Sequence, residues 1–296
     1  MPGYLVRRLL LTVPVLLGVA TLVFSLIHLV PGAPAQAMMG EGAAQADVDA
    51  LRKTLGLDQP LLTQYVAFLT HAATGDLGTS FRTGQPVTRM IAERVPATAE
   101  LALASMIVAI AIAIPLGVLA AVNKGTAVDY GAMTFALAGV SIPNFWLGPL
   151  LAIVFAVEFG WLPVSGRGTL AHLVLPAVSL GLALAAILAR MTRASMLDEL
   201  NELYIRAARA RGVSRAATIT RHALRNSLVP LMTIIALQFG AVLTGAVITE
   251  TIFAWPGIGR LLIQSIGFRD YPMVQGCILV GCPGSTAVAS IKRSAA

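Results

Sequence analysis

The chain has 296 residues, of which 57% are hydrophobic and only 12% are charged, and its mean hydropathy is +0.80. Soluble domains carry about 25% charged residues, so this composition excludes a water-soluble globular protein. The formal net charge of +7 would suggest an acidic partner in a soluble chain, but in a membrane protein the location of the charges matters more. Cys277 and Cys282 provide no disulfide framework, and the four histidines are too scattered for a zinc site.

Five stretches without Asp, Glu, Lys or Arg are long enough to cross a bilayer, which takes about 20 apolar residues. They cover residues 9–30, 101–123, 132–157, 171–189 and 228–249. The first follows Arg7 and Arg8 as a signal peptide would. Because a signal h-region has only about 7 to 15 residues, we interpret this stretch as an uncleaved anchor. A sixth apolar run, 271–280, is too short for a span.

The two longest hydrophilic segments differ in charge, and this difference predicts the orientation. Residues 31–97 contain five basic and six acidic residues, a net charge of −1. Residues 192–227 contain seven arginines and three acidic residues, a net charge of +4. Because basic loops stay in the cytoplasm, we expect the second segment and the N-terminus inside and the first segment outside.

The outer segment carries helix signals. Asp47 is expected to cap a helix that runs to Leu55 and ends at Gly56. Asp58-Gln59-Pro60 is expected to open a second helix that runs to Leu69. These signals indicate a small folded cap rather than a linker.

Several kinds of chemistry lack their sequence signals. None of the three lysines stands in a phosphate-binding G-x-x-x-x-G-K-[ST] loop, so we expect no ATP hydrolysis by this chain alone. The five spans contain no ionisable group of the kind that ion-coupled carriers use, and we interpret His28 and His172, at span ends, as interfacial residues. The sequence around Ser141 lacks the second glycine of a nucleophile elbow, which disfavours an intramembrane enzyme.

The basic segment predicts a helix-turn-helix at the membrane surface. Asp198 and Glu199 suit the N-terminus of a first helix, Gly212 ends it, and Ser214 can cap a second helix. The second helix is expected to have an apolar face with Ile219, Ala223 and Leu224 and a basic face with Arg221 and Arg225. On charge alone, anionic lipid explains such a loop as well as a protein partner does.

The residues of this loop closely resemble a known motif. The segment Tyr204-Ile-Arg-Ala-Ala-Arg-Ala-Arg-Gly212, followed by Arg221-His-Ala-Leu-Arg-Asn-Ser-Leu-Val-Pro230, is similar to the EAA loop of ABC importer permeases. The similarity is to the dipeptide and oligopeptide branch of this family. Nickel and glutathione permeases are similar to this branch. Further segments that resemble this branch are 55–60, 75–78, 142–148, 191–196, 250–260 and 269–272.

The resemblance implies that the loop forms coupling helices, which dock into a groove of an ATPase subunit. The expected ATPase-coupling residues are Tyr204, Arg206, Ala207, Ala208, Gly212, His222, Arg225 and Asn226. Ala207, Ala208 and Gly212 occupy the small-residue positions of the motif, which would let a helix seat deeply in a groove. Arg206 stands at the family's Glu position, as in the peptide branch.

A second expected site is an extracytoplasmic motif of Trp255, Pro256, Gly257 and Gly259. Outside this context, the same residues would indicate an ordinary turn beside an interfacial tryptophan.

The spans and the resemblance together imply an all-α polytopic membrane protein, a permease-like helical bundle with five transmembrane helices and an incomplete sixth. Its expected parts are an N-terminal transmembrane anchor (1–30), an extracytoplasmic region (31–97), a permease core (98–280) with the cytoplasmic coupling loop (192–227), and an atypical C-terminal tail (281–296). The family continues with a full sixth helix, whereas the residues from Gly281 look unrelated. This suggests a truncated, frameshifted or divergent end.

By resemblance, the chain is a permease subunit of an ATP-driven importer of dipeptides or oligopeptides in the bacterial inner membrane, and not itself an enzyme. Its expected partners are a second homologous permease, two cytoplasmic ATP-binding subunits, an extracytoplasmic substrate-binding protein and the lipid bilayer, with no nucleic acid. No cofactor or metal is expected on this chain, because ATP and Mg²⁺ would bind the ATPases. The alternatives are a nickel or glutathione importer, a non-transporting membrane scaffold and an intramembrane enzyme.

Overall fold

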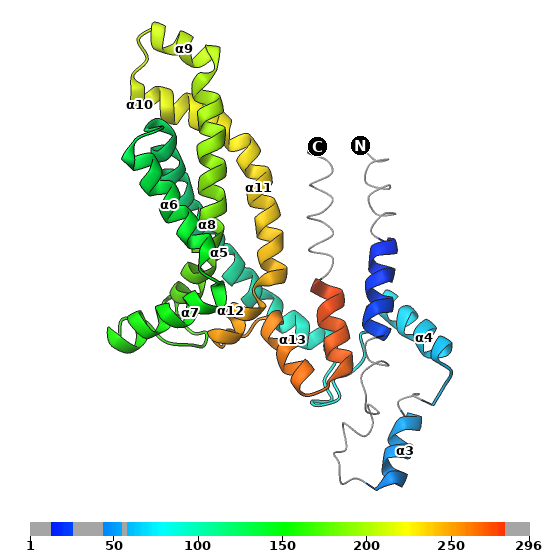
Figure 1. The fold of residues 1–296 in the computed structure, drawn as a ribbon. Helices are drawn as coiled ribbons and strands as arrows, with labels where there is room; N and C mark the ends of the chain where they lie inside the picture. The colour runs from blue at the N-terminus through cyan, green and yellow to red at the C-terminus, as the bar shows by residue number, and fades with distance from the viewer. Residues whose placement is uncertain (1–12, 26–43, 55–57, 282–296) are drawn as a thin grey trace. The chain divides into compact units, whose positions relative to one another are not determined.

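A computed structural model describes residues 13–25, 44–54 and 58–281 (Figure 1). Helices joined by turns and loops make up this part of the chain, and its isolated β-bridge joins Thr79 and Pro86. The chain forms two compact units, Met1–Thr98 with Pro256–Ser290 (unit 1) and Ala99–Trp255 with Ile291–Ala296 (unit 2). Helix α5, Val87–Val122, begins in unit 1 and continues in unit 2. The all-α fold expected from the sequence is confirmed.

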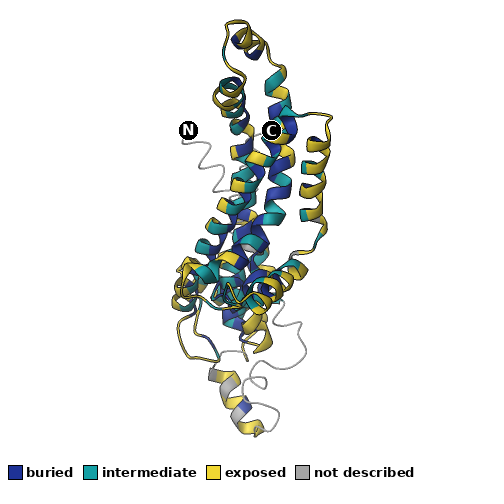
Figure 2. Cartoon of the chain, turned by 90° about the vertical axis from the view of Figure 1, so that its left-hand side faces the viewer, coloured by how far each residue is buried: buried dark blue, intermediate teal, exposed yellow. Residues whose placement is uncertain are grey.

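Unit 2 is a bundle of long helices with a core of small residues. After α5 come α6 (Ala127–Ser141), α7 (Asn144–Ala152), the π-helix η1 (Ile153–Glu158), α8 (Leu170–Asn201), α9 (Leu203–Ala210), α10 (Arg215–Ala217), the π-helix η2 (Thr218–Ala223), α11 (Leu224–Gly245) and α12 (Val247–Ile252). The core residues from α5, α6 and α8 are Met106, Ala109, Ala113, Ala136, Ala185, Ala186, Leu188 and Ala189. Buried residues run along the facing sides of these helices (Figure 2).

Glycines allow two of these helices to touch. A Cβ atom added to Gly117 of α5 would lie 2.5 Å from Thr192 Cβ and 2.7 Å from the Ala189 carbonyl oxygen, both in α8. A Cβ atom on Gly181 of α8 would lie 2.9 Å from the Ser105 carbonyl oxygen of α5. Without a hydrophobic drive between helices in lipid, close backbone approach of this kind supplies the packing energy.

Three described helices are long and apolar enough to cross a membrane: Val87–Val122, Leu170–Asn201 and Arg215–Leu243. They overlap the predicted spans 101–123, 171–189 and 228–249, and each helix is longer than the span that it overlaps. The last predicted span continues past α11 into α12. The first predicted span is described only as the helix Val13–Ser25, and the run 271–280 forms the helix Tyr271–Gly281. The other residues of the first span, with His28, and the tail after Gly281 lie outside the described residues.

The third predicted span, 132–157, is not one continuous helix. Helix α6 ends at Ser141, Ile142 is extended (φ −85°, ψ 118°), and α7 begins after Pro143. A residue before proline is pushed out of the helical region by the proline ring, so Pro143 breaks the helix. Pro115, Pro149 and Pro176 lie inside helices.

Unit 1 combines segments from both ends of the chain. It contains the helix Val13–Ser25, α3 (Gln45–Thr54), α4 (Leu61–Ala73), the start of α5, α13 (Ile258–Gly267) and the helix Tyr271–Gly281. Val87 and Ile91 of α5 pack with Leu261 of α13 and with Met273 and Cys277. The Phe24 ring lies 5.3 Å from the Tyr65 ring, which ties α4 to the first helix.

The segment 31–97, expected outside the membrane, contains the described helices α3 and α4, and the structure corrects two of their predicted boundaries. Pro60 precedes α4 as predicted, and the helix runs four residues beyond Leu69 to Ala73. Asp47 is not a cap, because α3 already begins at Gln45. Gly56, the expected stop, lies outside the described residues.

A loop of unit 1 is held by a carboxylate from the other end of the chain. Ser80 Oγ donates to Asp270 Oδ2 at 2.5 Å, and the Phe81 backbone N–H donates to Asp270 Oδ1 at 3.1 Å. The Arg82 guanidinium lies over the Phe268 ring, 3.3 Å from its centroid. These contacts join residues about 190 positions apart in the sequence.

Candidate functional site

The basic segment forms the predicted helix-turn-helix at the end of α8. Helix α9 follows α8 after Glu202, whose backbone is extended (φ −64°, ψ 148°). Figure 1 shows α9 and α10 at the far end of α8, where the chain turns back into α11. The prediction for Asp198 and Glu199 is wrong: they lie in the last turns of α8 and do not open α9. Met196, Leu197 and Leu200 pack into an apolar cluster there. Because this packing stabilises the end of α8, the helix continues beyond the acidic residues to Asn201.

The turn between the two short helices follows the local signals of the sequence. Gly212 has φ +81°, a left-handed conformation that favours glycine at the end of a helix. The Val213 N–H donates to the Ala208 carbonyl at 3.2 Å and satisfies one of the last carbonyls of α9. Ser214 caps the next helix, because its Oγ accepts from the Ala217 N–H at 3.3 Å. Both predictions are confirmed.

The inner face of α9 packs on the rest of the bundle. Ile205 and Ala208 are buried, and Ile205 contacts a cluster that includes Met196 of α8, Ala121 of α5 and Ala223 of η2. Ile219 and Leu224 join the same cluster, which confirms the apolar face predicted for the second helix. Since Ala208 is 2% exposed, its small side chain serves contact within this chain.

The outer face of α9 is exposed and combines an apolar residue with arginines. Leu203 is 76% exposed. The other exposed residues of α9 and its turn are Tyr204, Arg206, Ala207, Arg209, Ala210, Arg211, Gly212 and Ser214. Arg221 and Arg225 are exposed on the second helix, and His222 is half-buried. Of the expected coupling residues, only Ala208 is buried and His222 is half-buried, while the other six are exposed.

Tyr204 and Asn226, expected in the coupling loop, bind each other. Asn226 Nδ2 donates to the Tyr204 hydroxyl oxygen at 2.9 Å, and the Tyr204 hydroxyl donates to Glu199 Oε2. Partial burial of the ring, followed by the hydrogen bond to Glu199, raises the pKa of Tyr204, so the phenol keeps its proton and can donate. The sequence pattern did not indicate this role for Glu199.

A partly buried ion pair joins α6 to α8. Arg193 Nε donates to Asp129 Oδ1 and Arg193 Nη2 donates to Asp129 Oδ2, both at 2.6 Å. The Gly125 N–H donates to Asp129 Oδ2 at 3.0 Å. The Arg193 hydrogen bonds, with that of Gly125, lower the pKa of Asp129 to about 2. Sequence reasoning missed this pair, because the two residues are 64 positions apart and single charges in short loops are common.

The expected extracytoplasmic motif crosses the boundary between the two units. In unit 2, Trp255 is 1% exposed, so it is a buried residue and not an interfacial one. The Arg167 guanidinium lies 5.8 Å from the centre of its ring and donates to Glu100 at 2.6 Å. In unit 1, Gly257 precedes α13, and the Ile258 N–H donates to Thr98 Oγ1 at 2.9 Å.

The predicted interfacial histidine His172 caps a helix. The Thr169 N–H donates to His172 Nδ1 at 3.2 Å, and the Thr169 side chain completes a capping box at the start of α8. Within the described residues, no three His, Cys, Asp or Glu side chains are grouped as a metal site would require.

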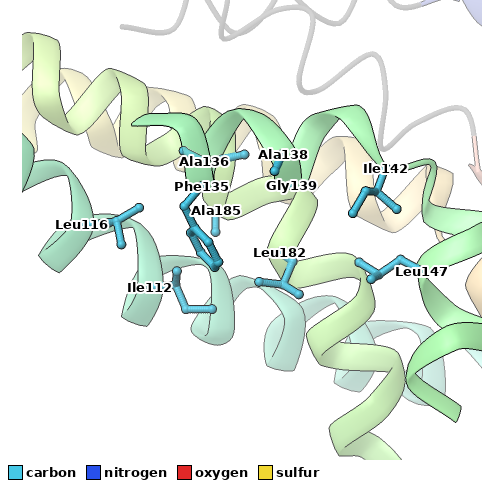
Figure 3. Close-up of a pocket in the computed structure, with 11 residues that line it drawn as sticks. Ile112, Leu116, Phe135, Ala136, Ala138, Gly139, Ile142, Leu147, Leu182 and Ala185 are labelled. Carbon is cyan, nitrogen blue, oxygen red and sulfur yellow. The ribbon is translucent and has the colours of Figure 1, made fainter. Parts of the chain in front are cut away.

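An apolar groove of about 130 Å³ lies between α5, α6, α7 and α8 (Figure 3). Its walls carry aliphatic and aromatic side chains, among them Ile112, Leu116, Phe135 and Leu182. No charged or hydroxyl-bearing residue lines it, so it offers no hydrogen bonds to a polar molecule such as a peptide.

Comparison with known proteins identifies the class. Residues 113–291 match the family described as "Binding-protein-dependent transport system inner membrane component", and residues 1–102 match its N-terminal membrane component. The chain belongs to this family of transport-system membrane subunits. The match extends ten residues beyond Gly281, so it includes part of the tail that looked unrelated from the sequence.

Curated relatives narrow the family to peptide-type permeases. The chain is 42% identical to the dipeptide transport system permease protein DppB of Alkalihalophilus pseudofirmus, over 95% of this chain and 92% of the relative. It is 45% identical to the glutathione transport system permease protein GsiC of Pectobacterium atrosepticum, with the same shares covered. It is 44% identical to the di/tripeptide permease DppB of Pseudomonas aeruginosa, again over 95% of this chain and 92% of the relative.

Solved structures share the fold. An inward-facing methionine ABC transporter, MetNI, superposes with a TM-score of 0.53 and 20% identity, over 68% of this chain and 96% of the matched chain. An amino acid ABC transporter gives a TM-score of 0.50 and 16% identity, over 70% of this chain and 94% of the other. The chain is thus a multi-pass inner-membrane permease subunit of an ABC importer, a family that works with ATPase and substrate-binding partners.

Proposed function

We propose that this permease receives the conformational change of two partner ATPases through the outer face of α9. The single observation that supports this role is the division of α9 into a buried face, Ile205 and Ala208, and an exposed face with Leu203, Arg206 and Ala207. Leu203 is suited to an apolar pocket, and the arginines are suited to an acidic rim around it. A second homologous permease would complete the membrane pathway.

The proposed mechanism follows from differential binding. ATP favours the closed arrangement of the ATPases, and a ligand shifts a conformational equilibrium only by its difference in affinity between the two states. A closed ATPase pair would hold α9 in a different position from an open pair. Because α9 is packed against α8 and η2, its displacement would reorient the helices of unit 2. ATP and Mg²⁺ would bind the partners, and this chain would carry out no chemistry.

The proposed docking face can be tested by placing a bulky side chain on the exposed side and on the buried side of α9. Ala207→Trp should reduce co-purification of the ATPases by tenfold or more while the thermal stability of the chain stays unchanged. Ala208→Trp should instead destabilise the chain, because position 208 is buried. Ala73→Trp, at an exposed alanine of α4, controls for a surface tryptophan. Normal ATPase recovery with Ala207→Trp would contradict the proposed docking face.

We propose dipeptides or short oligopeptides as the substrate, imported from an extracytoplasmic binding protein. The peptide permeases among its relatives support this choice, and the glutathione permeases of similar identity support a second candidate, glutathione. Uptake by the complete complex in proteoliposomes, with dipeptide, tripeptide, glutathione or Ni²⁺ supplied with the binding protein, separates the candidates. Uptake of glutathione or Ni²⁺ alone would contradict the peptide assignment, and an assembled complex without uptake would indicate a scaffold.

The proposed orientation places the N-terminus and α9 in the cytoplasm and α4 outside. The net charges of the two hydrophilic segments support it. Single cysteines placed at exposed positions of α4 and α9, after replacement of Cys277 and Cys282, should react with an impermeant maleimide in intact cells only in α4. Labelling of α9 but not α4 would reverse the orientation.

A further inference from the structure

The position of α9 depends on side chains, because its backbone connection to α8 is weak. Glu202 alone separates the two helices, and its extended backbone interrupts the helical hydrogen bonds between them. A single non-helical residue can act as a hinge, since it absorbs a large change in φ and ψ. Helix α9 has only eight residues, Leu203–Ala210, and a helix of this length is not stable by itself in water.

Two kinds of contact hold α9 in place. On one side, Ile205 is fully buried in the apolar cluster of α5, α8 and η2. On the other side, the contact is polar and consists of the Tyr204 hydroxyl with its two partners. Glu199 lies in the last turn of α8, and Asn226 lies in the first turn of α11. One phenol therefore connects the helices on both sides of the coupling loop.

We propose that the Tyr204 hydroxyl is a positioning group that fixes α9 against the ends of α8 and α11, so that a displacement of α9 is transmitted to both helices. This assignment rests on the proposed function of α9 as the docking helix. It assigns Tyr204 and Asn226 a contact within this chain and gives Glu199 a role.

The chemistry of a phenol fits this position. The hydroxyl has one hydrogen to donate and lone pairs to accept, and here it donates to a carboxylate and accepts from an amide. A hydrogen bond to an ionised carboxylate is about twice as strong as a neutral one. Phenylalanine would keep the ring and its packing while removing both hydrogen bonds. Tyr204→Phe should thus leave the chain folded and loosen only α9.

The first measurement is hydrogen exchange of the assembled complex in nanodiscs without nucleotide. Tyr204→Phe should accelerate exchange of the α9 backbone amides by roughly tenfold, as expected when the charge-assisted hydrogen bond to Glu199 is lost together with the one from Asn226. Exchange of α8 before Arg193 should stay unchanged. Glu199→Ala should have a similar effect, whereas Glu199→Gln keeps an acceptor oxygen and should have a smaller one. Tyr130→Phe, at a ring that is 68% exposed on α6, is the matched control.

The second measurement is the amount of substrate imported per ATP hydrolysed in proteoliposomes. Tyr204→Phe should lower this ratio by about three- to tenfold, with ATPase subunits still bound in normal amount. The Tyr204→Phe/Glu199→Ala double variant should be no worse than Tyr204→Phe alone, because Tyr204→Phe already removes the contact with Glu199.

The outcomes separate this proposal from the proposed function. Unchanged exchange of α9 in Tyr204→Phe would overturn the positioning role. Faster exchange with an unchanged ratio of substrate to ATP would overturn the transmission role, while the docking function would stand. Failure of the unsubstituted complex to couple uptake to ATP would overturn the proposed function itself, independently of any result with Tyr204.

Discussion

Arg193 of α8 and Asp129 of α6 form a bidentate ion pair, with both N···O distances at 2.6 Å. The Asp129 side chain is 3% exposed and the Arg193 side chain 28%. Because α8 leads directly to Glu202 and α9, the pair joins the start of α6 to the helix that precedes the proposed docking helix.

Removal of one partner of this pair should destabilise the permease. Arg193→Met would leave the Asp129 carboxylate buried without its cation, and we expect a loss of roughly 2 kcal/mol, less than for a fully buried pair because Arg193 is partly solvated. Asp129→Asn should be milder. Thermal unfolding of the purified complex measures both. If the charge exchange Asp129→Arg/Arg193→Asp recovered no stability over the single variants, the pair would not be the cause.

The contribution of the same pair to the free energy of unfolding should change with pH only under acidic conditions. The folded-state pKa of Asp129 is lowered from 3.8 to about 2, so the unfolded chain binds this proton first as the pH falls. The stabilisation from the pair is then complete above about pH 5 and is lost between about pH 4 and pH 2. Chemical unfolding of the permease and of Asp129→Asn should give a constant difference from pH 8 to pH 5. A difference that changes within this range would contradict the assigned cause.

The contact of α5 with α8 should tolerate no side chain at position 117. A Cβ atom there would lie 2.5 Å from Thr192 Cβ, and overpacking of this kind typically costs about 1–3 kcal/mol. We therefore expect Gly117→Ala to lower the unfolding temperature of the complex. Gly131→Ala, where a Cβ atom meets nothing within 4 Å, should be neutral or stabilising. Equal effects of the two substitutions would argue against close helix contact at Gly117.

The effect of replacing Gly212 in the turn after α9 should depend on whether the new residue tolerates the backbone conformation, and not on steric clash of its side chain. Gly212 has φ +81°, and a Cβ atom there meets nothing within 4 Å. Asparagine tolerates the left-handed region and valine does not. Gly212→Asn should keep most of the uptake activity, whereas Gly212→Val should strain the turn by about 1–2 kcal/mol and reduce uptake with the complex still assembled. Comparable uptake by both variants would show that the turn conformation is unimportant.

The loop that Asp270 holds should open when this carboxylate is removed. Asp270→Ala leaves the Ser80 hydroxyl and the Phe81 N–H without their acceptor, a loss of about 1–3 kcal/mol. We expect faster cleavage by trypsin after Arg82, and intermediate cleavage in Asp270→Asn, which keeps one oxygen. Asp58→Ala, at an exposed carboxylate, is the control. No change in cleavage at Arg82 in Asp270→Ala would show that the loop is held elsewhere.

Local chemistry made part of the site predictable. The sequence around Gly212 and Ser214 encodes a helix stop and a helix cap that need only neighbouring residues. The apolar face with Ile219 and Ala223 follows from helical spacing. In contrast, the acidic pair Asp198 and Glu199 looked like a helix start, and only the packing of Met196 and Leu200 shows why α8 continues to Asn201.

The sequence by itself determined that this chain crosses a membrane and which family it resembles. The length of the apolar stretches and the difference in net charge between the two hydrophilic segments can be read directly along the chain. A sequence motif as long as that of the coupling loop is specific to one family. Tertiary structure decided which residues of the loop face outward and which bind each other. Tyr204 meets Asn226 across 22 residues and Asp129 meets Arg193 across 64, because helix ends distant in sequence come together only when the bundle forms. No local signal distinguishes such partners from the other polar residues at helix ends.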